Sequence, residues 1–256
     1  LCIALSQSGE TIDTIQSVRH ANKKGSKTFS LINTRGSTLD RISDESIFLD
    51  AGPEKAVAST KAFTTKLSLL LMAAYQYVDK PEKAKDQLKR AVKSSKKVLH
   101  ETSVKKIKDI AKSIKDSPSI FVLGKGQSYP AALEVALKIK EISYIHAEGF
   151  PSGELKHGVI ALIEEGTPCL VIAPDDETKS DILTAAMEVQ ARGGRIIGLS
   201  PQNESVFDDY VPVEDASTAS IIPNVIAGQI LAYYLAIFKD LDPDMPRNLA
   251  KSVTVK

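Results

Sequence analysis

Aromatic residues and an excess of one charge are what this sequence most lacks. It has no tryptophan, and aromatic side chains make up 5% of its 256 residues. Surfaces that stack nucleic-acid bases or sugar rings depend on aromatic side chains, so the composition disfavours them. The 33 basic and 32 acidic residues leave a net charge of +1, which gives no support for a general nucleic-acid surface. We therefore expect no nucleic-acid partner.

Cysteine clusters, metal-ligand spacings and long apolar runs are lacking as well. The two cysteines, Cys2 and Cys169, lie in separate apolar runs, which predicts buried free thiols rather than a disulfide. The histidines show no spacing typical of metal ligands, so we expect neither a metal nor another cofactor. The apolar runs reach about ten residues, against about 20 for a membrane helix. We expect a cytoplasmic protein without a membrane partner.

What the chain does contain is a regular alternation of short apolar runs with helical patterns. The runs that predict strands are residues 28–32, 46–49, 119–123, 169–172 and 195–199. Such alternation predicts an α/β fold with mostly parallel sheets. The apolar run at residues 1–5 also has the character of a buried parallel strand, which needs a neighbour on each side. We therefore expect the chain to be a fragment, with further elements before residue 1.

Two stretches of the chain echo each other at an offset of about 167 residues. Residues 4–11 and the strand that follows align with residues 172–178 and the strand after them. The echo predicts two copies of one α/β unit, the first at 1–80 and incomplete at its start, the second at 116–240. The second copy has Asp175 and Asp176 where the first has small hydroxyl residues. Because carboxylates repel phosphate, we expect only the first copy to bind an anion.

Residues 81–115, between the two copies, are rich in lysine. A nucleic-acid contact is one interpretation of these lysines. Acidic residues interleave with them, however, and apolar residues recur at helical spacing, which favours a solvated helical linker that leads into the second copy. The apolar positions are Leu88, Val92, Leu99, Val104, Ile107 and Ile110.

The most informative motif is Ser-Gln-Ser-Gly-Glu-Thr at residues 6–11, directly after the first apolar run. Serine and threonine hydroxyls donate hydrogen bonds, Gly9 allows close approach of the backbone, and the helix predicted from Ile12 adds free N–H groups and positive partial charge. The motif therefore predicts a phosphate site. A serine-rich helix cap without a ligand is the alternative.

A predicted helix at residues 130–145 places Glu134, Lys138 and Glu141 on one face. Three such residues form either a surface ion-pair ladder or, under a cleft, a proton-transfer group. The polar run that follows, from His146 to Gly158, has the composition of a functional loop. Within it, His157 is a candidate general acid or base, with an ordinary loop histidine as the alternative.

Two further segments are polar but ambiguous. Residues 57–66 are rich in small and hydroxyl residues and precede a long helix, so they predict either a second hydroxyl-binding wall or a helix cap. Residues 241–256 follow a strong helix and form a polar tail, in which a lone lysine is normally solvated.

Taken together, these motifs closely resemble the isomerase half of the glutamine–fructose-6-phosphate aminotransferase (glucosamine-6-phosphate synthase) family. That half consists of two sugar isomerase (SIS) domains, which are flavodoxin-like three-layer αβα units. The matching motifs are SQSGET at 6–11, VASTKAFTTK at 57–66, ALEVALKIKEISYIHAEGF at 132–150, SGELKHG at 152–158 and PRNLAKSVTV at 246–255. The SQSGET motif is shared by many SIS proteins, whereas the last two motifs are more selective.

The resemblance implies a substrate, fructose 6-phosphate, and a product, glucosamine 6-phosphate. The phosphate of fructose 6-phosphate would be bound by Ser6, Gln7, Ser8 and Thr11. The sugar would be bound by Ser59, with Val57 and Ala250 beside it. In the C-terminal tail, Lys251 would form a Schiff base with the C2 ketone, which ammonia then displaces.

The resemblance also implies roles for the second copy. Glu141 would move a proton between C1 and C2, with Lys138 and Glu134 positioning and polarising around it. His157 would open the sugar ring and, in this family, reaches the site from the neighbouring subunit of a homodimer.

The sequence departs from the family in three respects. The family's glutaminase domain, with its N-terminal cysteine nucleophile, is missing, so Cys2 is not that residue. The start of the first SIS unit is missing too, and residues 149–151 (Gly-Phe-Pro) stand where relatives have small residues. Two other functions stay open: a non-catalytic SIS module that senses a phosphosugar, and a fructosamine-phosphate deglycase. Lys251, Glu141 and His157 favour the enzyme over the sensor, and the tail favours the synthase over the deglycase.

Overall fold

The computed structural model describes residues 1–251 and divides them into two compact units. Unit 1 comprises Leu1–Ala74 together with the tail from Asp244, and unit 2 comprises Tyr75–Pro243. The predicted tail at 241–256 and its motif therefore extend, at residues 252–256, outside the described residues.

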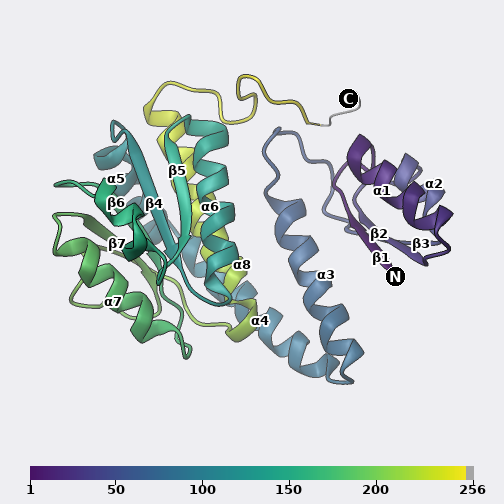
Figure 1. The fold of residues 1–256 in the computed structure, drawn as a ribbon, viewed down its shortest axis with the longest axis horizontal. Coiled ribbons are helices and arrows are strands. Elements are labelled where there is room, and N and C mark those ends of the chain that lie inside the picture. The colour runs from purple at the N-terminus through teal and green to yellow at the C-terminus, as the bar shows by residue number, and fades with distance from the viewer. Residues whose placement is uncertain (252–256) are drawn as a thin grey trace. The chain divides into compact units, whose positions relative to one another are not determined.

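Unit 1 is a three-stranded parallel sheet with helices on both faces (Figure 1). Its strands are β1 (Cys2–Leu5), β2 (Thr28–Ile32) and β3 (Glu45–Phe48), in that spatial order, and its helices are α1 (Ile12–Lys23), α2 (Thr38–Ile42) and α3 (Lys61–Tyr77). Ile32 packs with residues of α1 and α2, whereas its neighbour Leu31 packs with Ala62 of α3. Successive residues of a strand point to opposite faces, so β2 joins two small cores.

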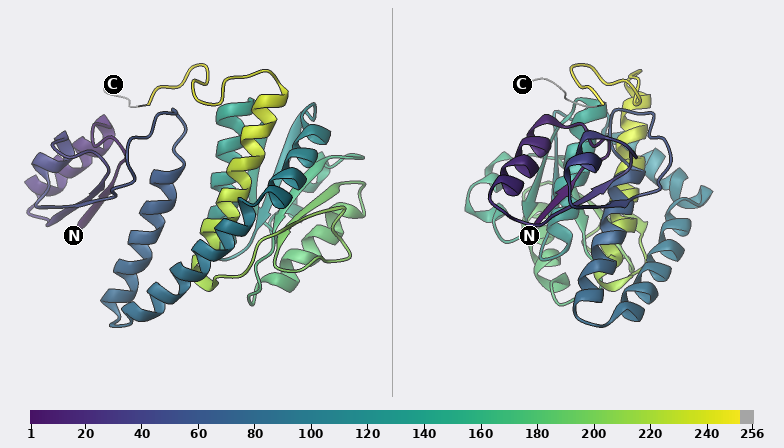
Figure 2. Two further views of the ribbon diagram at one scale, coloured as in Figure 1. Left: turned by 180° about the vertical axis from the view of Figure 1, so that it is seen from behind. Right: turned by 90° about the vertical axis from the view of Figure 1, so that its right-hand side faces the viewer.

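Unit 2 is a five-stranded parallel sheet in the order β5-β4-β6-β7-β8. The strands are β4 (Ser119–Gly124), β5 (His146–Pro151), β6 (Pro168–Ile172), β7 (Arg195–Ser200) and β8 (Asp209–Pro212). The helices are α4 (Pro81–Val98), α5 (Glu101–Ile114), α6 (Ser128–Ser143), α7 (Lys179–Gln190) and α8 (Ile221–Phe238), with short 3-10 helices η1 (Leu155–His157), η2 (Val159–Leu162) and η3 (Ser217–Ser220). In the views of Figures 1 and 2, α8 runs alongside α6, and α7 covers the opposite face of the sheet.

The predicted α/β architecture with parallel sheets is confirmed, and both units repeat one order of elements. In unit 1 the order β1-α1-β2-α2-β3 matches β6-α7-β7-β8 of unit 2 except for the short helix α2, and the matched strands are neighbours in the same sequence within each sheet. Among the described residues, β4 and β5 have no counterpart in unit 1. The carboxyl ends of parallel strands are where α/β proteins bind ligands, so the turns after β1 and β6 are candidate ligand sites.

The predicted strand and helix boundaries agree with the structure to within about two residues, with two omissions. Residues 146–151, interpreted as part of a polar loop, form β5, and residues 209–212 form β8. Both strands lie at the edges of the five-stranded sheet. An edge strand tolerates glycine and proline and need not be apolar throughout, so these two lack the apolar signal of the central strands.

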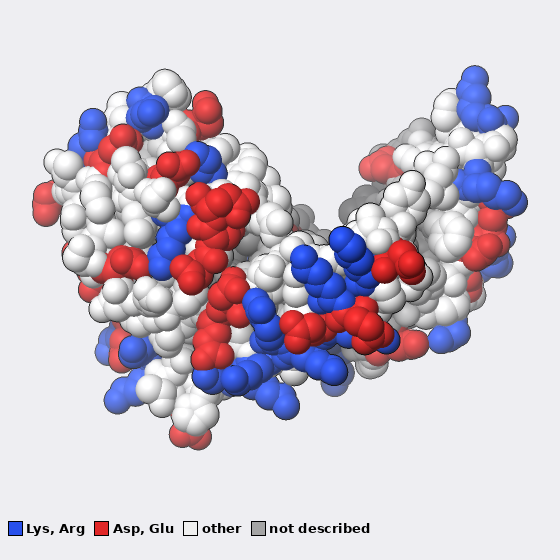
Figure 3. All heavy atoms as spheres, turned by 90° about the horizontal axis from the view of Figure 1, so that it is seen from below, with Lys and Arg blue, Asp and Glu red and all other residues white. Residues whose placement is uncertain are grey.

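The lysine-rich segment is helical, as predicted, and the predicted apolar positions Ile107 and Ile110 on α5 are buried, but the buried face of α4 differs from the predicted one. Val92 and Leu99 are exposed, whereas α4 buries Ala84, Ala91 and Ser94. The Ser94 hydroxyl donates to the Glu214 carbonyl at 2.9 Å. Small residues on this face allow α4 to pack within unit 2. On the face drawn in Figure 3, basic and acidic side chains are interspersed.

One helix is longer and more apolar than our count of apolar runs suggested. Ser217–Phe238 is long and apolar enough, by length and composition alone, to cross a membrane. Over half of its most apolar window, 56%, is buried, and it packs against α4, α5 and α6. A core helix passes the same test, so this feature is weak evidence for a membrane span.

Candidate functional site

The turn between β1 and α1 has the geometry of an anion cradle. The Gly9 N–H donates to the Ser6 hydroxyl at 2.9 Å, and the Glu10 N–H donates to the Ser8 hydroxyl at 3.2 Å. Because these oxygens accept from the backbone, their own O–H groups are left to donate. Thr11 is the N-cap residue of α1, yet its side chain does not cap the helix. Hydroxyl donors and the N-terminus of a helix therefore meet in one turn.

Gly9 is required by the shape of this turn. Its φ of +71° is strained for any other residue, and a Cβ atom there would lie 2.1 Å from the Ser37 hydroxyl oxygen. The Gly9 carbonyl also accepts from the Leu39 N–H at 3.0 Å. The cradle is thus packed directly against the start of α2.

The carboxylate of the motif is engaged elsewhere. Glu10 accepts from the Thr38 N–H at 2.7 Å, at the start of α2. Hydrogen bonds from Thr38 hold the pKa of Glu10 below its ordinary value, so it is ionised near neutral pH. The positive end of α2 offsets the negative charge of Glu10. This reduces the electrostatic repulsion between Glu10 and an anion bound in the cradle.

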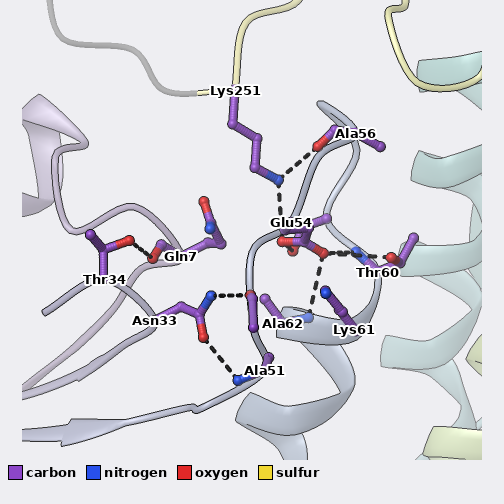
Figure 4. A network of polar contacts seen from close by, with 12 residues as sticks. Gln7, Asn33, Thr34, Ala51, Glu54, Ala56, Thr60, Lys61, Ala62 and Lys251 are labelled. Carbon is purple, nitrogen blue, oxygen red and sulfur yellow. Dashed lines mark hydrogen bonds and ion pairs between the residues drawn. The ribbon is translucent and has the colours of Figure 1, made fainter.

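At the same end of the sheet, Asn33 connects the cradle with the loop before α3. Its N–H donates to the Gln7 carbonyl at 3.2 Å. Its side chain accepts from the Ala51 N–H at 3.0 Å and donates to the Gly52 carbonyl at 2.8 Å (Figure 4). Sequence reasoning did not single out Asn33, whose only signal is its position directly after β2.

Lys251 lies on this loop rather than in solvent. Its ammonium group donates to the Glu54 carboxylate at 3.2 Å and to the Ala56 carbonyl at 2.8 Å (Figure 4). At the start of the tail, the Asp244 carbonyl accepts from the Val57 N–H at 3.0 Å. The structure therefore places the predicted Schiff-base lysine in the same unit as the cradle.

Glu54 is a site residue that sequence reasoning missed. Its side chain is 3% exposed and accepts from the Thr60 N–H at 2.6 Å and from the Ser59 hydroxyl at 3.3 Å. Burial acts to raise the pKa of Glu54, but hydrogen bonds from Thr60 and Lys251 outweigh it and hold the pKa below its ordinary value. A carboxylate just before a helix was a visible capping signal, but nothing in the sequence connected it to Lys251.

The predicted sugar-binding residues lie close to this carboxylate. The Ser59 hydroxyl donates to Glu54, and the backbone N–H of Val57 is hydrogen-bonded to the tail. Ala250 is exposed. The structure thus brings Val57, Ser59 and the tail together around one loop.

In unit 2, the predicted face of α6 holds a buried ion-pair group. The Lys138 side chain is 4% exposed, and its ammonium lies 3.5 Å from a Glu134 oxygen and donates to the Glu141 carboxylate. The two carboxylates are 11% and 21% exposed. The shared face is confirmed, and its burial distinguishes the group from an ordinary surface ladder.

The other predicted residue of unit 2, His157, lies apart from that group. It is the exposed last residue of η1, and its N–H donates to the Glu154 carbonyl at 3.1 Å. It is not a member of the Lys138 ion-pair group.

The turn between β6 and α7 corresponds to the cradle. A carboxylate lies in it, at the N-terminus of α7. Asp176 accepts from the Thr178 N–H at 2.8 Å, at the start of α7. The prediction that this turn binds no phosphate remains a prediction, and a carboxylate at the helix N-terminus favours it.

The thiols are both free, as predicted. Cys169 is buried, and burial raises the pKa of its thiol to about 12, whereas Cys2 is half-buried. In the described part of the chain, no group of three or more His, Cys, Asp or Glu residues could hold a metal ion.

Several known proteins are similar to this chain. Residues 1–75 and 113–234 match the SIS domain family. The chain is 42% identical, over its whole length, to the glutamine–fructose-6-phosphate aminotransferase [isomerizing] of Thermococcus kodakarensis and 43% identical to that of Pyrococcus horikoshii. It spans 44% of the length of each of these relatives.

Solved structures agree with this grouping. The C-terminal domain of glucosamine-fructose-6-phosphate aminotransferase from Francisella tularensis is 35% identical, with a TM-score of 0.83 over 95% of this chain and 72% of that one. The tagatose-6-phosphate ketose/aldose isomerase of Escherichia coli shares the fold, with a TM-score of 0.78 at 18% identity over 97% of this chain and 71% of that one. The chain therefore belongs to the SIS domain family, and within it to the isomerase part of the glutamine–fructose-6-phosphate aminotransferases.

Proposed function

We propose that this chain binds fructose 6-phosphate and, with ammonia, converts it to glucosamine 6-phosphate. The observation that carries the proposal is the docking of Lys251 on Glu54 and Ala56, in the unit that holds the 6–11 cradle. A phosphate site alone suits any phosphosugar-binding protein. A partly buried lysine amine in the same unit adds a nucleophile for a ketone.

The cradle would bind the phosphate through the O–H groups of Ser6, Ser8 and Thr11, the Gln7 side chain and the N-terminus of α1. The phosphate would accept from these groups and would be favoured by the positive end of the helix. Binding there fixes the substrate at one end and leaves its ketone to be oriented by other residues.

Lys251 would then act as the nucleophile. Its neutral amine adds to the C2 carbonyl, and loss of water gives a Schiff base. Ammonia adds to that imine and the lysine amine leaves, which gives fructosimine 6-phosphate and regenerates Lys251. In the parent chain, a glutaminase domain would supply the ammonia.

The remaining step is a ketose-to-aldose shift. Glu141 would take a proton from C1 and return one to C2, while the proton of the C1 hydroxyl is lost and the imine nitrogen gains one, which yields the aldehyde at C1 and the amine at C2. Lys138, held between Glu134 and Glu141, would position the base and stabilise negative charge that develops near it. His157, from the neighbouring subunit of a homodimer, would open the sugar ring.

Product formation tests the proposal. The protein is incubated with fructose 6-phosphate and an ammonium salt, and glucosamine 6-phosphate is quantified by mass spectrometry. We expect product from the wild type and at least a hundredfold less, on the order expected for loss of a covalent catalyst, from Lys251→Arg. Tight substrate binding without product would instead indicate a sensing module. Turnover of a fructosamine phosphate without synthesis would indicate a deglycase.

A further inference from the structure

Glu54 makes an unusual set of contacts for a buried carboxylate. It accepts from the Thr60 N–H at 2.6 Å and the Ala62 N–H at 3.4 Å, both in the first turn region of α3. It also accepts from the Ser59 hydroxyl at 3.3 Å and from the Lys251 ammonium at 3.2 Å. A carboxylate that is 3% exposed needs such partners, because an unpaired buried charge is costly.

The contacts of Glu54 join three parts of unit 1 that the proposed function uses. These are the N-terminus of α3, the proposed sugar ligand Ser59 and the tail lysine Lys251. Lys251 has three N–H donors, of which Glu54 and the Ala56 carbonyl engage two. Its side chain is 27% exposed, so the amine is held in place but stays accessible to solvent.

We propose that Glu54 is a positioning residue that docks the tail and holds the Lys251 amine at the start of α3. The proposal deepens the proposed function, since it specifies how the Schiff-base lysine is oriented. The hydrogen bonds to Glu54 and to the Ala56 carbonyl fix where the amine lies before the substrate binds.

The alternative is that Glu54 merely caps α3. The variant Glu54→Gln separates the two roles, since the amide oxygen still accepts from the α3 N–H groups but carries no charge. Asp44→Asn is the matched control. Asp44 also lies in unit 1 and accepts from a backbone N–H, that of Thr28 at 2.8 Å, but it does not contact Lys251.

The first readout requires no substrate. The labelling rate of Lys251 with trace acetic anhydride is measured at pH 8 by peptide mass spectrometry, relative to the exposed Lys105. We expect Glu54→Gln to raise this rate several-fold, because the amine loses its charge-assisted hydrogen bond to the carboxylate and is held less firmly. Asp44→Asn should leave the rate unchanged. An unchanged rate in Glu54→Gln would overturn the proposal.

The second readout uses fructose 6-phosphate and borohydride to trap the Schiff base. We expect the highest trapping rate to fall about tenfold in Glu54→Gln, because the amine is no longer held in place. If the wild type gives no adduct while Glu54→Gln raises the labelling rate of Lys251 as expected, the proposed function fails and the positioning role stands. If Glu54→Gln does not fold, Glu54→Asp replaces it. Its shorter side chain should raise Lys251 labelling near pH 8 several-fold, and unchanged labelling would contradict the proposal.

Discussion

Replacement of Lys138 by methionine should destabilise unit 2 severely. The Lys138 side chain is 4% exposed, and its ammonium contacts two carboxylates, those of Glu134 and Glu141. Methionine keeps most of the apolar stem and its packing, so the variant removes mainly the charge. The two largely buried carboxylates would then lose the ammonium that both contact.

The magnitude follows from their burial. Removal of one partner of a buried ion pair costs about 3–5 kcal/mol. Glu141 keeps 21% exposure, so water offsets part of the penalty and we expect about 3 kcal/mol.

Urea unfolding followed by tyrosine fluorescence measures this loss in unit 2, in which Lys138 lies. All seven tyrosines lie between residues 75 and 234, within unit 2. Lys140→Met is the matched control, because Lys140 lies on the same helix and is exposed. A loss of unfolding free energy below about 1 kcal/mol, or one equal to that of Lys140→Met, would show that Lys138 and its two carboxylates behave like an exposed ion pair. That result would refute the reasoning.

Three other predictions concern the packing and acid sensitivity of the units. Gly9→Ala should destabilise unit 1 more than Gly25→Ala does, as measured by far-UV circular dichroism melts. Both glycines have φ above +70°, but only at Gly9 would a Cβ atom contact another residue. Equal effects would show that the contact with Ser37 is unimportant. Gly228→Ala should lower the unfolding free energy by about 1–3 kcal/mol, measured by tyrosine fluorescence, because its Cβ atom would lie 2.3 Å from the side chain of Val135. Adding Val135→Ala to this variant should restore part of the loss. Hydrogen bonds hold the folded-state pKa values of Glu10 and Asp44 below their ordinary values of 4.5 and 3.8. The stability that they contribute is therefore present above those ordinary values and is lost as pH falls through the lower folded-state pKa values. Asp44→Asn should flatten this acid dependence of the melting temperature.

Local patterns made the central strands and the cradle predictable. The strand–turn–helix at residues 2–23 follows from an apolar run, a glycine and small hydroxyl residues within about ten positions, so sequence neighbours decide its structure. The ion-pair group on α6 was predictable for the same reason, since helical spacing alone places Lys138 between its two carboxylates.

What could not be predicted depends on partners that are distant in the sequence. Glu54 and Lys251 are 197 residues apart, and no local pattern reports their ion pair. The exposure of Val92 and Leu99 depends on which face of α4 meets the rest of unit 2, and there small residues were preferred. Edge strand β5 was missed because its glycine and proline resemble a loop until its pairing with β4 is known.

The measurement that most directly tests the central claim is borohydride trapping at Lys251. The protein is incubated with fructose 6-phosphate, reduced and digested, and the adduct is located by peptide mass spectrometry. The account predicts a hexose-phosphate adduct on the peptide that contains Lys251, absent from Lys251→Arg. The absence of an adduct at Lys251, in a protein whose melting temperature fructose 6-phosphate still raises, would contradict it.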